Sequence, residues 1–230
     1  MAFLLAAVLS AASFLLVLAH SPARAGSHPP PGQDITCGLE PVRLSPGEQI
    51  AVEAGRIVVR EVPDTRPKGR TFEAVGTFAA SAADVLRIVT DFGHYDEFMP
   101  RVERVAVTEE GPGVFLVEQH LKLPLGVRRR YRLRYTVLPA AEGFRVEWVK
   151  VPWPEVPLSH SVVDTSGHWQ VGQFGEGRLL AVCRVFTDPG KVPLGMTGLA
   201  LSTSRRELPK VIERVRKRLL GDKSRGPDDD

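Results

Sequence analysis

Four of the six histidines stand at positions that could exchange a proton with a ligand, namely His94, His120, His160 and His168. None of them sits with a Ser or Cys and a carboxylate in a recognisable nucleophile pattern. The chain also lacks the C-x-x-C and H-E-x-x-H spacings at which cysteine and histidine hold zinc. We therefore assign no catalytic residue and expect neither a metal nor a cofactor.

One pairing could still support acid–base chemistry. His120 and either Tyr131 or Tyr135 lie on neighbouring segments with strand-like alternation, so their side chains could meet inside a cavity, as a cyclase would need. The alternative is a hydrogen-bonded histidine with a structural role. Replacing His120 or Tyr131 separates the two hypotheses, because only a catalytic pair loses turnover while ligand binding stays intact.

The clearest strand pattern runs through residues 128–138. Four arginines, at positions 128, 130, 132 and 134, alternate with the apolar or aromatic residues 131, 133, 135 and 137. The arginine side is expected to be a solvated outer face paired with Glu118 and Glu147 on neighbouring strands. Alternatively, it attracts anionic membrane or phosphate head groups.

The order of the elements predicts the fold class. Strands are expected at residues 57–59, 72–80, 102–107, 114–123, 128–138, 144–151, 168–174 and 178–187, with a helix that begins after Ser81. Residues 45–48 are expected to form a turn. A long helix over residues 199–220 carries the apolar stripe Leu208, Val211, Ile212, Val215 and Leu219, and Gly221 is expected to cap it. Consecutive strands followed by one helix indicate an α+β domain with an antiparallel sheet.

Several short sequences within residues 56–220 resemble the START-like superfamily, in particular bacterial proteins similar to polyketide cyclases and coenzyme-Q-binding START-type proteins. They are VGTF at 75–78, SAADV at 81–85, TDF at 90–92, YDEFMP at 95–100, GHW at 167–169, DPG at 188–190 and LP at 208–209. The resemblance implies a helix-grip fold, in which a curved antiparallel sheet wraps on a long C-terminal helix around an internal ligand cavity. It does not imply one activity, because the superfamily includes carriers, sensors and cyclases.

The expected ligand is a lipid or another hydrophobic small molecule. Residues expected to line its cavity are Phe115, Val117, His120, Tyr131, Leu133, Tyr135, Phe144, Val146, Trp148, Trp153, Val211 and Val215. Trp153 lies in a loop stiffened by three prolines, which is either a lid or a rigid connection. A polyketide cyclase or aromatase could use the same cavity. A third hypothesis is an interaction module whose interior is filled by side chains.

The first residues predict export. Residues 2–19 carry no charged side chain, and the Ala23-Arg24-Ala25 triplet fits a signal peptidase that cuts before Gly26. An uncleaved N-terminal anchor is the alternative. Either way the domain is expected in the periplasm or secreted. The predicted organisation is a signal peptide (1–25), an extension and linker (26–55), a START-like domain (56–220) and a polar tail (221–230).

Three features bear on the compartment and the partners. Cys37 and Cys183 could form a disulfide in an oxidising compartment, or they are two separate buried thiols. The net charge of +3, without a basic block interleaved with aromatics, argues against nucleic acid. The basic final helix could make transient contact with an anionic membrane surface.

Overall fold

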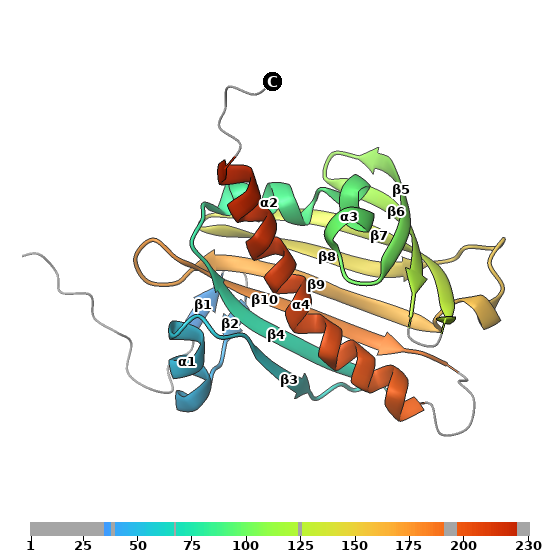
Figure 1. Cartoon of the computed structure of the whole chain (residues 1–230), viewed down its shortest axis with the longest axis horizontal. Coiled ribbons are helices and arrows are strands. Elements are labelled where there is room, and N and C mark those ends of the chain that lie inside the picture. Colours follow the sequence, from blue (N-terminus) through green and yellow to red (C-terminus); the bar gives the residue numbers. More distant parts are fainter. Residues whose placement is uncertain (1–34, 38–39, 67, 124–125, 191–196, 225–230) are drawn as a thin grey trace, which may run out of the picture.

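The computed structural model describes residues 35–37, 40–66, 68–123, 126–190 and 197–224, with side chains described for residues 40–66, 68–123, 126–190 and 205–221. Its main feature is an eight-stranded antiparallel sheet in the order β3-β4-β10-β9-β8-β7-β6-β5 (Figure 1). The strands are β3 (Val58–Val62), β4 (Arg70–Phe78), β5 (Val102–Gly111), β6 (Val114–Lys122), β7 (Arg128–Ala140), β8 (Gly143–Val151), β9 (Asp164–Gln173) and β10 (Leu179–Asp188).

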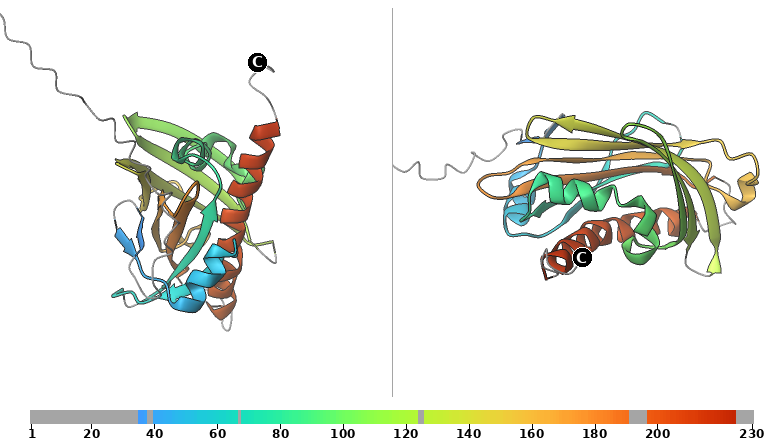
Figure 2. Two further views of the ribbon diagram at one scale, coloured as in Figure 1. Left: turned by 90° about the vertical axis from the view of Figure 1, so that its left-hand side faces the viewer. Right: turned by 90° about the horizontal axis from the view of Figure 1, so that it is seen from above.

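The helices after β4 lie on one face of this sheet. They are α2 (Ala82–Val89), the short η1 (Phe92–His94), α3 (Tyr95–Phe98) and α4 (Thr197–Ser224). Figure 2 shows that the sheet curves around them, with α4 running diagonally across its concave face. This arrangement confirms the predicted α+β helix-grip architecture. Gly221 does not end the last helix, because α4 continues to Ser224.

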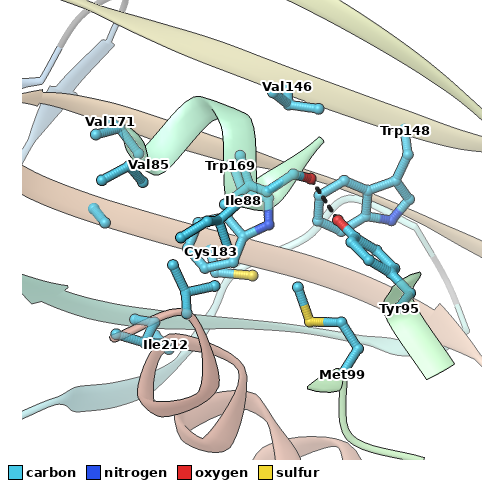
Figure 3. Packing of buried hydrophobic residues seen from close by; sticks show 14 of the residues in the cluster. Val85, Ile88, Tyr95, Met99, Val146, Trp148, Trp169, Val171, Cys183 and Ile212 are labelled. Atoms are coloured by element: carbon cyan, nitrogen blue, oxygen red, sulfur yellow. Dashed lines mark hydrogen bonds between the residues drawn. The ribbon is translucent and has the colours of Figure 1, made fainter. Parts of the chain in front are cut away.

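The concave face and α4 enclose the main core. The stripe predicted on the last helix is buried at Leu208, Ile212, Val215 and Leu219. Ile212 lies close to Cys183 of β10 and Ile88 of α2 (Figure 3). Removing this apolar surface from water contributes about 25 cal/mol per Å², and so it fixes α4 against the sheet.

The N-terminal extension packs against the opposite, convex face. It contains β1 (Ile35–Cys37), β2 (Glu40–Val42) and α1 (Pro46–Glu53). Val42, Leu44 and Val52 form a second apolar cluster with the outward-facing side chains of Val75, Phe174, Leu180 and Val182. The extension is therefore part of the folded domain rather than a linker over its whole length.

Residues 45–48 begin a helix, so the turn predicted there is wrong. The Ser45 side chain accepts a hydrogen bond from the Glu48 backbone N–H at 3.4 Å, and the Glu48 carboxylate accepts one from the Ser45 N–H at 2.8 Å. This capping box satisfies N–H groups that a helix start leaves open. Pro46 fits the first turn because its fixed φ suits a helix and its missing N–H has no partner there.

The predicted disulfide is not tested, because the side chain of Cys37 lies outside the described residues. Cys183 is a free, buried thiol on the concave side of β10. Its neighbour Val182 points the other way, toward β2. The predicted signal peptide also lies outside the described residues. Among the helices that are described, none is long and apolar enough to span a membrane.

Candidate ligand-binding site

Strand alternation brings most of the predicted cavity residues to the concave face. The residues that join the main core cluster there are Phe115, Val117, Tyr131, Leu133, Tyr135, Phe144, Val146, Trp148, Val211 and Val215. They come from β6, β7, β8 and α4, four elements that are separated in sequence and packed together in the fold. These side chains share the concave face, but only some of them border open space.

One end of the concave face is closed by side-chain packing. Val117, Val146 and Val215 are each 0 % exposed, and Phe144 is 1 % exposed. The ring of Phe92 packs against those of Tyr135 and Phe115, with centroids 4.4 and 5.3 Å apart. These residues form the core that supports the site rather than a surface that a ligand could touch.

The other end of the face opens into a pocket of about 380 Å³ where β7, β8 and β9 meet the loop of residues 152–163. Its lining is mainly apolar or aromatic and includes Tyr131, Trp153, Val156, Leu158 and Val163. Lys150 and Asp164 add one charge of each sign. A mostly apolar pocket of this size with a few polar groups suits a small hydrophobic molecule or part of a lipid.

Tyr131 supplies a polar group at the inner side of this pocket. Burial raises the pKa of its hydroxyl well above the usual value, so it stays protonated. The Tyr131 hydroxyl has no hydrogen-bond partner among the described residues. By contrast, the neighbouring Tyr135 oxygen accepts a bond from Gln119 Nε2 at 3.3 Å. Tyr131 is therefore available to donate to an oxygen of a bound ligand.

The assignment of His120 to the cavity is wrong. His120 pairs with Arg130 across β6 and β7, whereas Tyr131 pairs with Gln119. Because alternate residues of a strand point to opposite faces, His120 faces the convex side and Tyr131 the concave side. Burial and the nearby Arg130 and Arg104 lower the pKa of His120. The acid–base pair that a cyclase would need is not assembled by these two residues.

Trp153 lies at the edge of the pocket rather than inside the core. Its ring centroid is 6.0 Å from that of His120, and the Arg132 guanidinium lies over it at 5.1 Å. These contacts fix one side of the proline-rich loop to the convex surface. The loop then continues through Val156, which is 8 % exposed, to the short helix η3 (Leu158–His160).

The other three candidate histidines also lie away from the concave pocket. His94 is exposed beside Asp91, 2.5 Å away, and this hydrogen bond raises the pKa of the imidazole. His160 is exposed on η3, and His168 is buried on the convex face. In the part of the chain that the structure describes, no group of three His, Cys, Asp or Glu side chains could hold a metal ion.

The arginine face of β7 is an outward face with ion pairs, as predicted. Arg132 pairs with Glu118 at 2.6 Å, while Arg128 and Arg134 pair with Glu103 and Glu110. Glu147, however, pairs with Arg145 at 2.6 Å instead of the β7 arginines. The expected partner was wrong because Glu147 and Arg145 lie on the same face of one strand, two residues apart.

The residues of the site region that the sequence did not indicate include Gln119, Lys150, Val156 and Val163. Gln119 could have been found, because the alternation that begins at Phe115 and Val117 continues to 119 and not to 120. Lys150 continues the inward-facing side of β8 for the same reason. Val156 and Val163 lie in a loop, where no periodic pattern indicates the direction of a side chain.

The comparisons agree with this geometry. Residues 70–219 match the family model described as polyketide cyclase / dehydrase and lipid transport. The chain belongs to this family. The predicted resemblance to the START-like superfamily is thereby confirmed, and the family's match leaves out β1, β2, α1 and β3. Among curated proteins, sequence comparison finds no significant relative.

Solved structures show the same fold at low sequence identity. A STAR-related lipid transfer protein fragment from Xanthomonas axonopodis has a TM-score of 0.63 and 18% identity, covering 71% of this chain and 93% of its own. Human StAR-related lipid transfer protein 5 has a TM-score of 0.62 and 14% identity, covering 74% and 84%. The di-domain ARO/CYC protein StfQ from the steffimycin biosynthetic pathway has a TM-score of 0.54 and 15% identity, covering 69% and 53%.

Proposed function

We propose that this protein is an exported, non-enzymatic carrier that binds a lipid or similar hydrophobic ligand at the open end of its concave face. The observation that carries the proposal is the apolar pocket of about 380 Å³ beside Tyr131. A ligand entering this pocket loses contact with water at about 25 cal/mol per Å² of apolar surface. The Tyr131 hydroxyl would orient a polar end of the ligand.

The family and the similar structures support binding of this kind. The family description includes lipid transport, and two of the similar structures are named lipid transfer proteins. The cyclase alternative has support from the same family description and from StfQ. However, the acid–base pair of His120 and Tyr131 that a cyclase could use is not formed, because the two side chains point to opposite faces of the sheet. The carrier is therefore the stronger proposal.

The test is native mass spectrometry of protein isolated from its own cell envelope, followed by uptake from a lipid extract. We expect a bound mass of lipid size that is lost on denaturation. A spectrum of the empty protein, together with no uptake from the extract, would overturn the carrier and favour an interaction module with a filled interior.

Two matched variants connect ligand binding to this pocket. Val163→Arg places a charged side chain at the pocket mouth, where Val163 is 49 % exposed. Val149→Arg makes the same change at a residue that is 52 % exposed on β8 and does not line the pocket. We expect the first variant to reduce lipid uptake at least about tenfold, since a charge opposes burial of an apolar ligand. Equal uptake by both variants would place the ligand elsewhere.

Export has its own test, because it rests on the first 25 residues alone. Cell fractionation of the full chain, followed by N-terminal sequencing, is expected to give a periplasmic or secreted protein that begins at Gly26. A product retaining Met1 in the membrane fraction would instead support an uncleaved anchor. A full-length cytoplasmic protein would contradict both.

A further inference from the structure

The convex face carries a second pocket that the proposed carrier function does not use. It has a volume of about 490 Å³ and lies between β2 of the extension and β3. Its floor is formed by side chains of β4, β9 and β10, including Glu73, His168 and Arg184. Because these side chains point away from α4, this pocket lies on the opposite side of the sheet from the lipid site.

A row of charged and polar residues crosses the sheet under this pocket. Neighbouring strands pair Arg60 with Glu73, Glu73 with Arg184, and Arg184 with His168. Glu73 is 2 % exposed, and each of its oxygens accepts from one arginine, Oε2 from Arg60 Nε at 2.9 Å and Oε1 from Arg184 Nε at 2.6 Å. Both carboxylate oxygens of Glu73 are therefore already bonded to arginine side chains.

His168 presents a proton to the same pocket. It is 7 % exposed, and its Nδ1 lies 3.1 Å from Arg145 Nη2. An arginine can only donate, so Nδ1 must be the acceptor and the proton of the neutral ring must sit on Nε2. Nε2 has no hydrogen-bond partner among the described residues, although His168 lines the pocket. Nε2 is not fully enclosed, because it borders the pocket, so a ligand or water there is expected to accept its hydrogen bond.

The other groups around the ring determine which ligand fits. Arg145 also contacts Gln170 Oε1 at 2.9 Å and pairs with Glu147 and with Glu40 on the rim. These carboxylates are held by Arg145, whereas Arg60 and Arg184 each keep a guanidinium nitrogen that bonds to nothing in the described structure. Three carboxylates also line the pocket, and each has an arginine partner: Glu73 pairs with Arg60 and Arg184, Glu40 with Arg145, and Glu61 with Arg70.

From this arrangement we infer that the convex pocket binds an anionic group, a carboxylate or a phosphate, on His168 Nε2–H and on the guanidinium nitrogens of Arg60 and Arg184 that the Glu73 carboxylate leaves free. Charge-assisted bonds from two arginines and one imidazole match the oxygen atoms of such a group. The anion is either a small soluble molecule or the head group of a lipid. The site does not depend on whether the concave pocket carries a ligand.

The direct test follows the His168 ring by nitrogen–proton NMR. The full chain is titrated with sodium phosphate and with sodium acetate, at ionic strength held constant with sodium chloride. We expect the Nε2–H signal of His168 to shift with a saturable dependence on at least one of the two anions. No saturable shift with either anion would overturn the inference, and this measurement needs no variant.

A variant pair tests the location. Val62 lines the pocket on β3, and Val62→Asp would add a carboxylate without removing any of the three donors. It should weaken anion binding at least about tenfold by like-charge repulsion. The control is Val149→Asp, because Val149 lies on β8, on the same convex face of the sheet but outside the pocket. This variant should bind the anion as the unaltered protein does. Equal binding by both variants would also overturn the inference.

Vesicles separate the two sources of the anion. Phosphatidylcholine vesicles with and without phosphatidic acid are sedimented with the protein and with Val62→Asp. Sedimentation that needs phosphatidic acid and is lost in Val62→Asp identifies a lipid head group. Saturable binding of phosphate or acetate without such sedimentation identifies a small soluble anion. Each of these results supports the anion site.

Discussion

Arg216 of α4 donates from Nε to the Thr77 carbonyl oxygen near the end of β4, at a distance of 3.0 Å. Its Nη1 donates to the Gly55 carbonyl oxygen, also at 3.0 Å, between α1 and β3. Burial lowers the pKa of the guanidinium, and its Nη2 has no partner among the described residues. One side chain therefore ties the last helix to both the sheet and the N-terminal extension.

Arg216→Met should destabilise the protein by about 1–3 kcal/mol, because two carbonyl groups lose charge-assisted hydrogen bonds. Part of the loss is offset, since a partly unsatisfied buried charge is removed as well. The measurement is urea unfolding followed by circular dichroism. Arg214→Met, on the exposed side of α4, is the control and should stay within about 0.5 kcal/mol. An equal loss of unfolding free energy in the two variants would show that the hydrogen bonds of Arg216 do not stabilise the contact of α4 with the sheet and the extension.

Tyr95→Phe should cost about 1–2 kcal/mol of stability. The buried Tyr95 hydroxyl donates to the Val89 carbonyl oxygen at 2.5 Å, at the end of α2. A dashed line at Tyr95 marks this bond in Figure 3. Without the hydroxyl, this carbonyl loses its partner inside the core. Tyr131→Phe removes a hydroxyl that has no such bond and should change stability by less than about 0.5 kcal/mol. Thermal unfolding in the absence of lipid compares the two, and a larger loss for Tyr131→Phe would contradict the assignment.

His168 should make stability depend on pH. Burial, with help from Arg145 and Arg184, lowers the pKa of His168 from 6.5 to about 3. The unfolded chain takes up a proton near pH 6.5, while the folded protein does so only near pH 3. The stabilisation is therefore complete above pH 6.5 and is lost as pH falls toward 3, at about 1.4 kcal/mol per pH unit.

His168→Gln tests this slope, because glutamine can still accept a bond from Arg145 but does not titrate. The free energy of unfolding should fall less steeply between about pH 6 and pH 4 in this variant than in the unaltered protein. Parallel curves for His168→Gln and the unaltered protein would show that His168 is not buried in its neutral form.

Gly167→Ala should destabilise the concave face by about 1–3 kcal/mol through overpacking. A Cβ at Gly167 would collide with the Arg184 carbonyl oxygen and would lie 2.5 Å from the Trp148 ring. Gly93→Ala is the matched control, since a Cβ there meets nothing within 4 Å. Near-ultraviolet circular dichroism should report the displaced Trp148 ring in the first variant only. Equal stability of the two would mean that Trp148 moves freely.

Local patterns predicted much of the fold because they act over a few residues. The alternation in residues 128–138 correctly placed Tyr131 and Leu133 on one face and the arginines on the other. Of the five residues in the stripe predicted on α4, four are buried and Val211 is partly buried. The error at His120 was a failure to follow the same two-residue period along β6. The error at Ser45 came from giving weight to Pro and Gly over the Ser–Glu capping box.

By itself, the sequence determined the order of the main-sheet strands and the last helix, the alternation of faces along those strands, and the family to which the chain belongs. Only the tertiary structure decided which concave residues border a pocket and which are closed core, because that depends on where the Phe92 ring and the 152–163 loop pack. It also decided that Glu73, His168 and Arg184 share one convex pocket. Those residues are far apart in the chain, and only strand pairing brings them together.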